Sequence, residues 1–150
     1  MMTQKEYLSQ STEETLEFAS RLAKQLKPGS VIGLVGDLGS GKTTFIKGIA
    51  HGLGLANADE VKSPTFVLMH IYKTTIPLYH FDLYRLESAE DFQAIGFEEF
   101  TADSKAISCI EWADKAGSLL PAHTVFVHLE HLGLDRRRII IIPRHSAKPY

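Results

Sequence analysis

The sequence predicts an α/β fold, a single domain over residues 1–150 in which helices flank a mixed sheet of roughly seven strands. Three observations predict it. A chain of 150 residues suits one domain and leaves little room for a second. Hydrophobic residues make up 44% and charged residues 23%, a balance typical of a globular protein with a buried core. Apolar runs of strand length outnumber the helical segments between them. A mixed sheet is therefore expected, with parallel pairing near a glycine-rich turn and antiparallel pairing elsewhere.

The N-terminal segment predicts a short strand followed by a helix. Residues 5–10 are expected to form the strand. Ser11 and Glu14 have the spacing of a capping box, in which a hydroxyl and a carboxyl group satisfy free N–H groups at a helix start. Apolar residues continue at helical spacing to Leu26, and Pro28-Gly29 ends the helix.

A buried strand, a glycine-rich turn and a second helix are expected next. The run VIGLV at residues 31–35 is apolar throughout, as a strand covered on both faces would be. The helix is expected over residues 42–52. Two further strands are expected at residues 66–73 and 76–83, joined by a short turn.

The C-terminal half predicts one short helix and three strands. Ser88 and Asp91 form a second capping pattern, which predicts a helix over residues 90–95. An apolar strand is expected at residues 106–112. The final pair is expected at residues 125–132 and 138–142, around a turn that contains Gly133 and Asp135.

Composition excludes several classes of protein. A net charge of −2 is unlike that of a strongly basic nucleic-acid binder, so any contact with RNA is expected to be local or indirect, through a partner. The single cysteine, Cys109, excludes an internal disulfide framework and a cysteine-rich zinc site. The N-terminus has no signal-peptide pattern, and no run approaches the roughly 18 apolar residues needed to span a bilayer. A cytoplasmic protein without membrane contact is therefore expected.

Residues 36–43, GDLGSGKT, match the phosphate-binding pattern G-x-x-x-x-G-K-[ST] between a strand and a helix. Glycines let the backbone N–H groups approach an anion, and the helix N-terminus adds partial positive charge. Lys42 is expected to reach the β- and γ-phosphates and the Thr43 hydroxyl to bind Mg²⁺. A Rossmann site is disfavoured because the glycine spacing differs. The expected nucleotide-binding residues are Gly36, Asp37, Leu38, Gly39, Ser40, Gly41, Lys42, Thr43 and Thr44.

A nucleoside triphosphate site also needs a carboxylate near the metal, usually at the end of a neighbouring strand. Glu111 and Asp82 both end apolar strands and are the two candidates. His80 shares a strand face with Asp82 but has no third partner to suggest a metal site. The guanine motif N-K-x-D is absent, so adenine is favoured by elimination.

Four segments together resemble the bacterial TsaE family, formerly YjeE, a group of small P-loop ATPases used in threonylcarbamoyladenosine synthesis on tRNA. The segments are GDLGSGKTTF at residues 36–45, KSPTF at 62–66, YHFDLYR at 79–85 and IEW at 110–112. The resemblance implies a single P-loop NTPase-like domain that binds ATP and Mg²⁺ and hydrolyses ATP slowly on its own. It also implies work with TsaD and TsaB, which transfer the threonylcarbamoyl group, so that this chain is not itself the transferase.

The resemblance also implies roles for individual residues. Thr43 and Glu111 would be the Mg²⁺ ligands, and Lys42, Asp82 and Glu111 the catalytic group, with Asp82 needed for hydrolysis. The remaining residues implied are Ser63, Pro64 and Thr65 in a switch-like loop, Trp112 beside the nucleotide, and Thr12 and Arg137 near the adenine.

Two other functions remain open on the sequence. One is a small P-loop kinase that phosphorylates a metabolite, although no arginine lies between Arg85 and Arg136 to supply a lid. The other is a nucleotide-gated binding module without meaningful hydrolysis. ATP consumption that depends on a small acceptor would favour the kinase, and full function in an Asp82 or Glu111 variant would favour the module.

Overall fold

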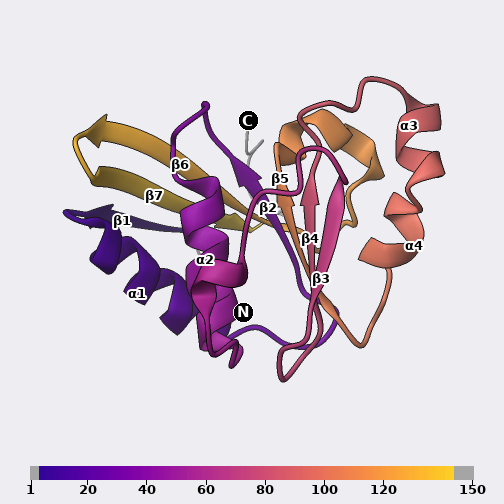
Figure 1. Cartoon of the computed structure of the whole chain (residues 1–150). Helices are drawn as coiled ribbons and strands as arrows, with labels where there is room; N and C mark the ends of the chain where they lie inside the picture. Colours follow the sequence, from indigo (N-terminus) through magenta and orange to yellow (C-terminus); the bar gives the residue numbers. More distant parts are fainter. Residues whose placement is uncertain (1–3, 144–150) are drawn as a thin grey trace.

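The structure is a computed structural model that describes residues 4–143, and in this range seven strands form one mixed sheet (Figure 1). The order across the sheet is β1-β7-β6-β2-β5-β4-β3. The strands are β1 (Lys5–Ser9), β2 (Val31–Val35), β3 (Met69–Tyr72), β4 (Leu78–Asp82), β5 (Ile107–Glu111), β6 (Val125–Gly133) and β7 (Arg136–Pro143).

The pairing follows the predicted division between parallel and antiparallel strands. β2 pairs in parallel with β5 and β6, and β5 pairs in parallel with β4. The outer pairs, β1 with β7, β6 with β7 and β3 with β4, are antiparallel. The carboxyl ends of β2, β4 and β5 therefore lie at one edge of the sheet, where ligands bind in open α/β folds.

Helices cover both faces of the sheet. The helical elements are α1 (Thr12–Ala23), α2 (Lys42–Gly52), α3 (Ala89–Ala94), α4 (Phe97–Thr101) and the 3₁₀ segments η1 (Ala58–Glu60) and η2 (Ala113–Leu119). On one face, α1 and α2 pack over a core that contains Ile32, Leu34 and Cys109. On the other face, α3, α4 and η2 pack over Phe81 and Ile110. None of the helices in the described range is long and apolar enough to cross a membrane.

Most predicted elements are confirmed, β2 and α2 to the residue. Ser11 caps α1 by accepting a hydrogen bond from the Glu14 N–H, but the Glu14 carboxylate accepts from Gln10 rather than closing the box on Ser11. α1 ends at Ala23, and tight turns continue the chain to Leu26. The capping box of Ser88 and Asp91 is present at α3.

The predicted strand over residues 66–73 is wrong at its start, because β3 begins only at Met69. Phe66 and Val67 are exposed, and Leu68 has a positive φ of 72° that no strand residue adopts. The N–H of Leu68 donates to the carbonyl of Pro64 within a turn. Three elements, η1, α4 and η2, were not predicted. Gly96 with φ of 69° separates α4 from α3, and Trp112 with φ of 59° turns the chain from β5 into η2.

Candidate functional site

The glycine-rich loop joins β2 to α2 at the carboxyl edge of the sheet. Gly41, the residue before α2, has φ of 104°, a conformation that strains any residue with a side chain. Gly36 has no room for one, since a Cβ there would lie 2.5 Å from the carbonyl oxygen of Leu129. The loop is thus held against β6, and the free N–H groups at the start of α2 are directed at the space in front of it.

Lys42 lies at the centre of this loop and is only 5% exposed. Its Nζ donates to the carbonyl oxygens of Gly36 at 2.6 Å and Asp37 at 3.0 Å, and it lies 4.1 Å from the centre of the Trp112 ring. Burial lowers the pKa of Lys42, and the carboxylate of Glu111 is the largest charge that opposes this shift. The ammonium group is a buried cation within reach of several oxygens.

Glu111 and Thr43 meet across the cleft. Glu111 is the last residue of β5 and 3% exposed. The Thr43 hydroxyl on α2 donates to its two carboxylate oxygens at 3.0 and 3.1 Å. Asp82 ends the neighbouring strand β4 in direct register with Glu111. Both acidic side chains therefore lie on the α2 side of the sheet, as the alternation of strand residues requires.

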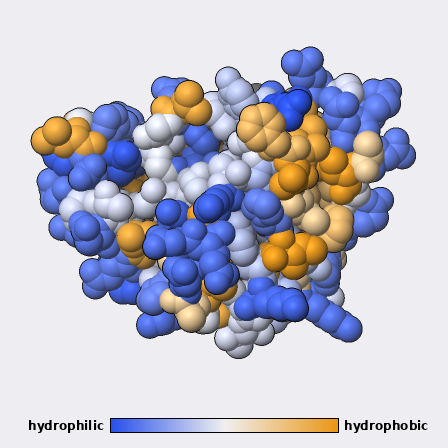
Figure 2. Space-filling view, viewed as in Figure 1, coloured by the Kyte–Doolittle hydropathy of each residue, from blue (hydrophilic) through white to orange (hydrophobic). Residues whose placement is uncertain are grey.

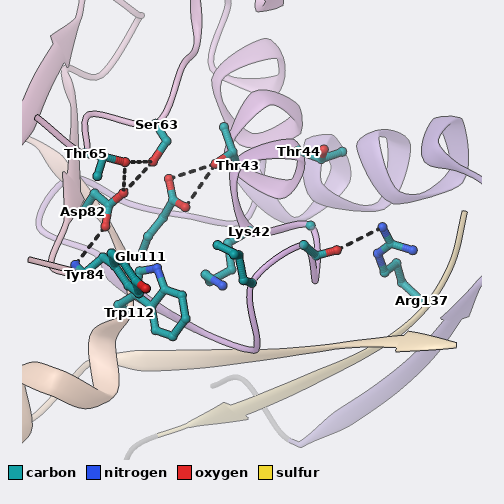
Figure 3. A pocket seen from close by; sticks show the side chains of 13 residues that line it. Lys42, Thr43, Thr44, Ser63, Thr65, Asp82, Tyr84, Glu111, Trp112 and Arg137 are labelled. Atoms are coloured by element: carbon teal, nitrogen blue, oxygen red, sulfur yellow. Dashed lines mark hydrogen bonds between the residues drawn. The ribbon is translucent and has the colours of Figure 1, made fainter.

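Asp82 organises the segment that contains Ser63 and Thr65. Its Oδ2 accepts hydrogen bonds from the Ser63 hydroxyl at 2.6 Å and the Thr65 hydroxyl at 2.8 Å, and its Oδ1 accepts from the N–H of Tyr84 at 2.9 Å (Figure 3). A carboxylate that accepts three hydrogen bonds has a fixed orientation. Residues 63–65 are thereby tied to the sheet edge beside Glu111.

These groups line one cleft of about 450 Å³, a size that suits a nucleotide. Figure 3 shows the loop and α2 on one side and Asp82, Glu111 and Trp112 on the other. The lining residues are Leu38, Gly39, Gly41, Lys42, Thr43, Thr44, Ser63, Thr65, Asp82, Tyr84, Glu111, Trp112 and Arg137.

Most residues expected at the site are thus brought together, with exceptions. Gly36, Asp37 and Ser40 do not line the cleft. Pro64 is buried between Ser63 and Thr65, which do. Thr12 is exposed on the first turn of α1 and does not line the cleft, so the structure does not bring this residue to the site.

Arg137 lies on β7, two strands away from β2 in the sheet order, and its side chain reaches the loop. Its Nε donates to the carbonyl oxygen of Ser40 at 2.8 Å, and a second nitrogen lies 3.4 Å from that of Gly39. Its neighbour Arg138 instead forms ion pairs with Glu6 and Glu130. One arginine of the basic run at residues 136–138 therefore belongs to the cleft, and it braces the loop.

Tyr84 is a lining residue to which the sequence assigned no role. Its ring lies 4.9 Å from that of Trp112, and the two aromatic side chains form one wall of the cleft. The sequence signal was its place in the YHFDLYR segment, two residues after Asp82, which accepts a hydrogen bond from the Tyr84 N–H.

The donor set suits Mg²⁺ when the ion is shared with phosphates. Within residues 4–143, no group of three or more His, Cys, Asp or Glu residues has metal-site geometry. Mg²⁺ is commonly held by one or two carboxylates together with phosphate oxygens and water, all of them hard oxygen ligands. The Thr43 hydroxyl and the Glu111 carboxylate, in direct contact, offer this kind of partial site.

Comparisons with known proteins agree on one family. A family model described as threonylcarbamoyl adenosine biosynthesis protein TsaE matches residues 9–139. The tRNA threonylcarbamoyladenosine biosynthesis protein TsaE of Treponema pallidum is 40% identical over 134 residues, 89% of this chain and 97% of that protein. The protein of the same name from Bacillus subtilis is 37% identical over 139 residues, 92% of this chain and 85% of that one. A crystal structure of Bacillus subtilis YdiB superposes with a TM-score of 0.72 at 34% identity, over 94% of this chain and 86% of that chain.

Proposed function

The chain belongs to the TsaE family of tRNA threonylcarbamoyladenosine biosynthesis proteins, and we propose that it acts there as an ATPase. The observation that carries this proposal is the convergence of Lys42, Thr43, Asp82 and Glu111 on one cleft in front of the glycine-rich loop. A phosphate-binding loop of this kind holds the triphosphate of a nucleotide. Adenine is the proposed base.

The loop and Lys42 would bind the phosphates. The N–H groups at the start of α2 point toward the anion, and the Lys42 ammonium, which donates to the Gly36 and Asp37 carbonyls, would move to the β- and γ-phosphate oxygens. Because Lys42 is buried, its charge acts through a medium that screens it less than water does.

Thr43 and Glu111 are the proposed Mg²⁺ ligands. The ion, when bound with ATP, would neutralise charge on the phosphate oxygens. The Thr43 hydroxyl and the Glu111 carboxylate already face each other across about 3 Å, so both oxygens can turn toward a common ligand. Asp82, fixed by Ser63, Thr65 and the Tyr84 N–H, would orient the attacking water.

We further propose that hydrolysis is slow in the isolated chain. Fast P-loop hydrolysis uses an arginine that stabilises charge on the transferring phosphoryl group. Among residues 4–143, Arg137 is the one arginine that lines the cleft, and it donates to the carbonyls of Ser40 and Gly39 instead. A partner would complete the site, and TsaD and TsaB, which carry out the threonylcarbamoyl transfer, are the proposed partners.

The test is reconstitution with purified TsaD and TsaB, ATP, Mg²⁺ and an unmodified tRNA. We expect repeated rounds of tRNA modification with the wild-type chain, loss of this stimulation with Lys42→Ala, and ATP turnover that rises when the partners are added. Modification that proceeds equally well with Lys42→Ala would contradict the proposal. ATP consumption that depends on a small-molecule acceptor would indicate a metabolite kinase instead.

A further inference from the structure

One polar side chain behind the cleft has no role in the mechanism above. His80 on β4 is fully buried, with no exposed surface. Its Nε2 lies 2.6 Å from Oε2 of Glu111, and its Nδ1 lies 3.2 Å from the hydroxyl oxygen of Tyr72. A buried histidine with a partner at each ring nitrogen has one orientation only.

The sheet places this histidine directly behind Glu111. His80 and Asp82 lie on the same face of β4, and Asp82 is in register with Glu111 on β5. Tyr72 comes from β3, on the other side of β4. These side chains therefore form a row across three neighbouring strands just below the cleft: Tyr72, His80 and Glu111.

The direction of the hydrogen bonds follows from their chemistry. An ionised carboxylate only accepts, so Nε2 of His80 carries the hydrogen that faces Glu111. Nδ1 is then free to accept from the Tyr72 hydroxyl. Burial raises the pKa of Tyr72, which keeps this hydroxyl protonated.

The same row of contacts continues into the segment at residues 62–65, which hydrogen-bonds to Asp82. The Tyr72 hydroxyl also lies 3.3 Å from the carbonyl oxygen and 3.4 Å from the nitrogen of Lys62. Lys62 directly precedes Ser63, whose hydroxyl donates to Asp82. The two acidic side chains of the cleft are thus connected through Tyr72 and His80 by contacts that do not depend on nucleotide.

We propose that His80 and Tyr72 are positioning residues of the cleft. By donating to Oε2, His80 restricts rotation of the Glu111 carboxylate, which would leave Oε1 available to the proposed Mg²⁺ ion. Tyr72 fixes the histidine ring and couples it to the Lys62–Thr65 segment. Such outer contacts typically change metal affinity or activity by about 10- to 100-fold when removed. This inference rests on the proposed ATPase function.

The test compares three substitutions. His80→Met keeps the volume but offers no N–H to Glu111. His80→Gln can restore a donor near the position of Nε2. The control is His51→Met, because His51 is exposed in the last turn of α2 and does not line the cleft.

Two readouts besides thermal unfolding are needed, because packing alone would change stability. The first is calorimetric affinity for a non-hydrolysable ATP analogue, measured with and without Mg²⁺. The second is kcat as a function of Mg²⁺ concentration. For His80→Met we expect at least a 10-fold loss of the Mg²⁺-dependent gain in affinity and at least a 10-fold lower kcat, with affinity unchanged in the absence of Mg²⁺. His80→Gln should recover most of both, and His51→Met should match the wild type.

The inference is overturned if His80→Met keeps both values within twofold of the wild type, or if His80→Gln is as defective as His80→Met. If His80→Met does not fold, Tyr72→Phe decides: a threefold or larger loss of Mg²⁺-dependent affinity supports the inference, and no change overturns it. A wild-type chain that neither binds nor hydrolyses ATP would instead refute the proposed function. Failure of the proposed function can therefore be distinguished from failure of the positioning role of His80 and Tyr72.

Discussion

Replacing Glu111 by glutamine removes one negative charge from the cleft and changes little else. The carboxylate is 3% exposed and accepts from the Thr43 hydroxyl and from Nε2 of His80. The amide of Glu111→Gln can keep both contacts, with its oxygen accepting from His80 and its nitrogen donating to Thr43. The variant is therefore expected to fold with the cleft intact.

The magnitude of the stability change follows from these two hydrogen bonds. A hydrogen bond to a charged group contributes about 1.5–3 kcal/mol and a neutral one about 0.5–1.5 kcal/mol, so two bonds lose roughly 1–3 kcal/mol when the charge is removed. Relief from burying a charge offsets part of this loss. We expect a net change in the free energy of unfolding within about 2 kcal/mol, which most domains tolerate.

Catalysis should be affected far more than folding. Without the carboxylate, the proposed Mg²⁺ site would lose its charged protein ligand, and loss of one preorganised electrostatic group in an active site lowers kcat about 10²- to 10³-fold. The change also removes the largest charge that supports the protonated form of Lys42, so the pKa of Lys42 falls further. As pH rises, Lys42 therefore loses its charge earlier than in the wild type, and phosphate binding weakens at a lower pH.

The assay is steady-state ATP hydrolysis at saturating Mg²⁺, with chemical unfolding measured in parallel. Glu98→Gln is the matched control, because Glu98 is an exposed glutamate on α4 outside the cleft. A Glu111→Gln variant that unfolds like the wild type and keeps kcat within threefold would refute the role given to this carboxylate.

Three further outcomes are expected. In Gly36→Ala, a Cβ only 2.5 Å from the Leu129 carbonyl must displace the loop, and calorimetry should show at least a 10-fold weaker affinity for ATP; wild-type affinity would contradict the tight loop geometry. Burial lowers the pKa of His128, so below about pH 6.5 the unfolded chain binds a proton that the folded chain does not, and stability falls. Urea unfolding at pH 7.5 and 5.5 should therefore show a smaller loss of stability in His128→Leu than in the wild type. An equal loss would contradict this role of His128. The Trp112 ring lies 4.1 Å from the Lys42 ammonium, so its fluorescence should change when ATP draws that group away, and a constant signal at saturating ATP would contradict the proposed movement.

The parts of the fold that the sequence predicted are those encoded by local patterns. The run VIGLV and the following helix coincide with β2 and α2, because an apolar strand, a glycine-rich turn and a helix start are all short-range features. The register of Asp82 with Glu111 was not readable, since it depends on the parallel pairing of β4 with β5. The sequence nominated both carboxylates because each ends an apolar strand.

The parts that it missed depend on tertiary contacts. The aromatic and β-branched residues Phe66 and Val67 favour a strand, yet the segment forms a turn because Asp82 draws the hydroxyls of Ser63 and Thr65 to the cleft. His80 had no third partner in its own segment, and its contacts with Tyr72 and Glu111 come from two other strands. The resemblance placed both Thr12 and Arg137 near the nucleotide, and only Arg137 lines the cleft.

The most direct test of the account is titration of the folded chain with ATP and Mg²⁺ in a calorimeter, beside the Lys42→Ala variant. We expect saturable binding of one nucleotide per wild-type chain and at least a 10-fold weaker affinity in the variant. Folded wild-type protein that gives no binding heat with ATP or GTP, or a variant that binds as tightly as the wild type, would contradict it.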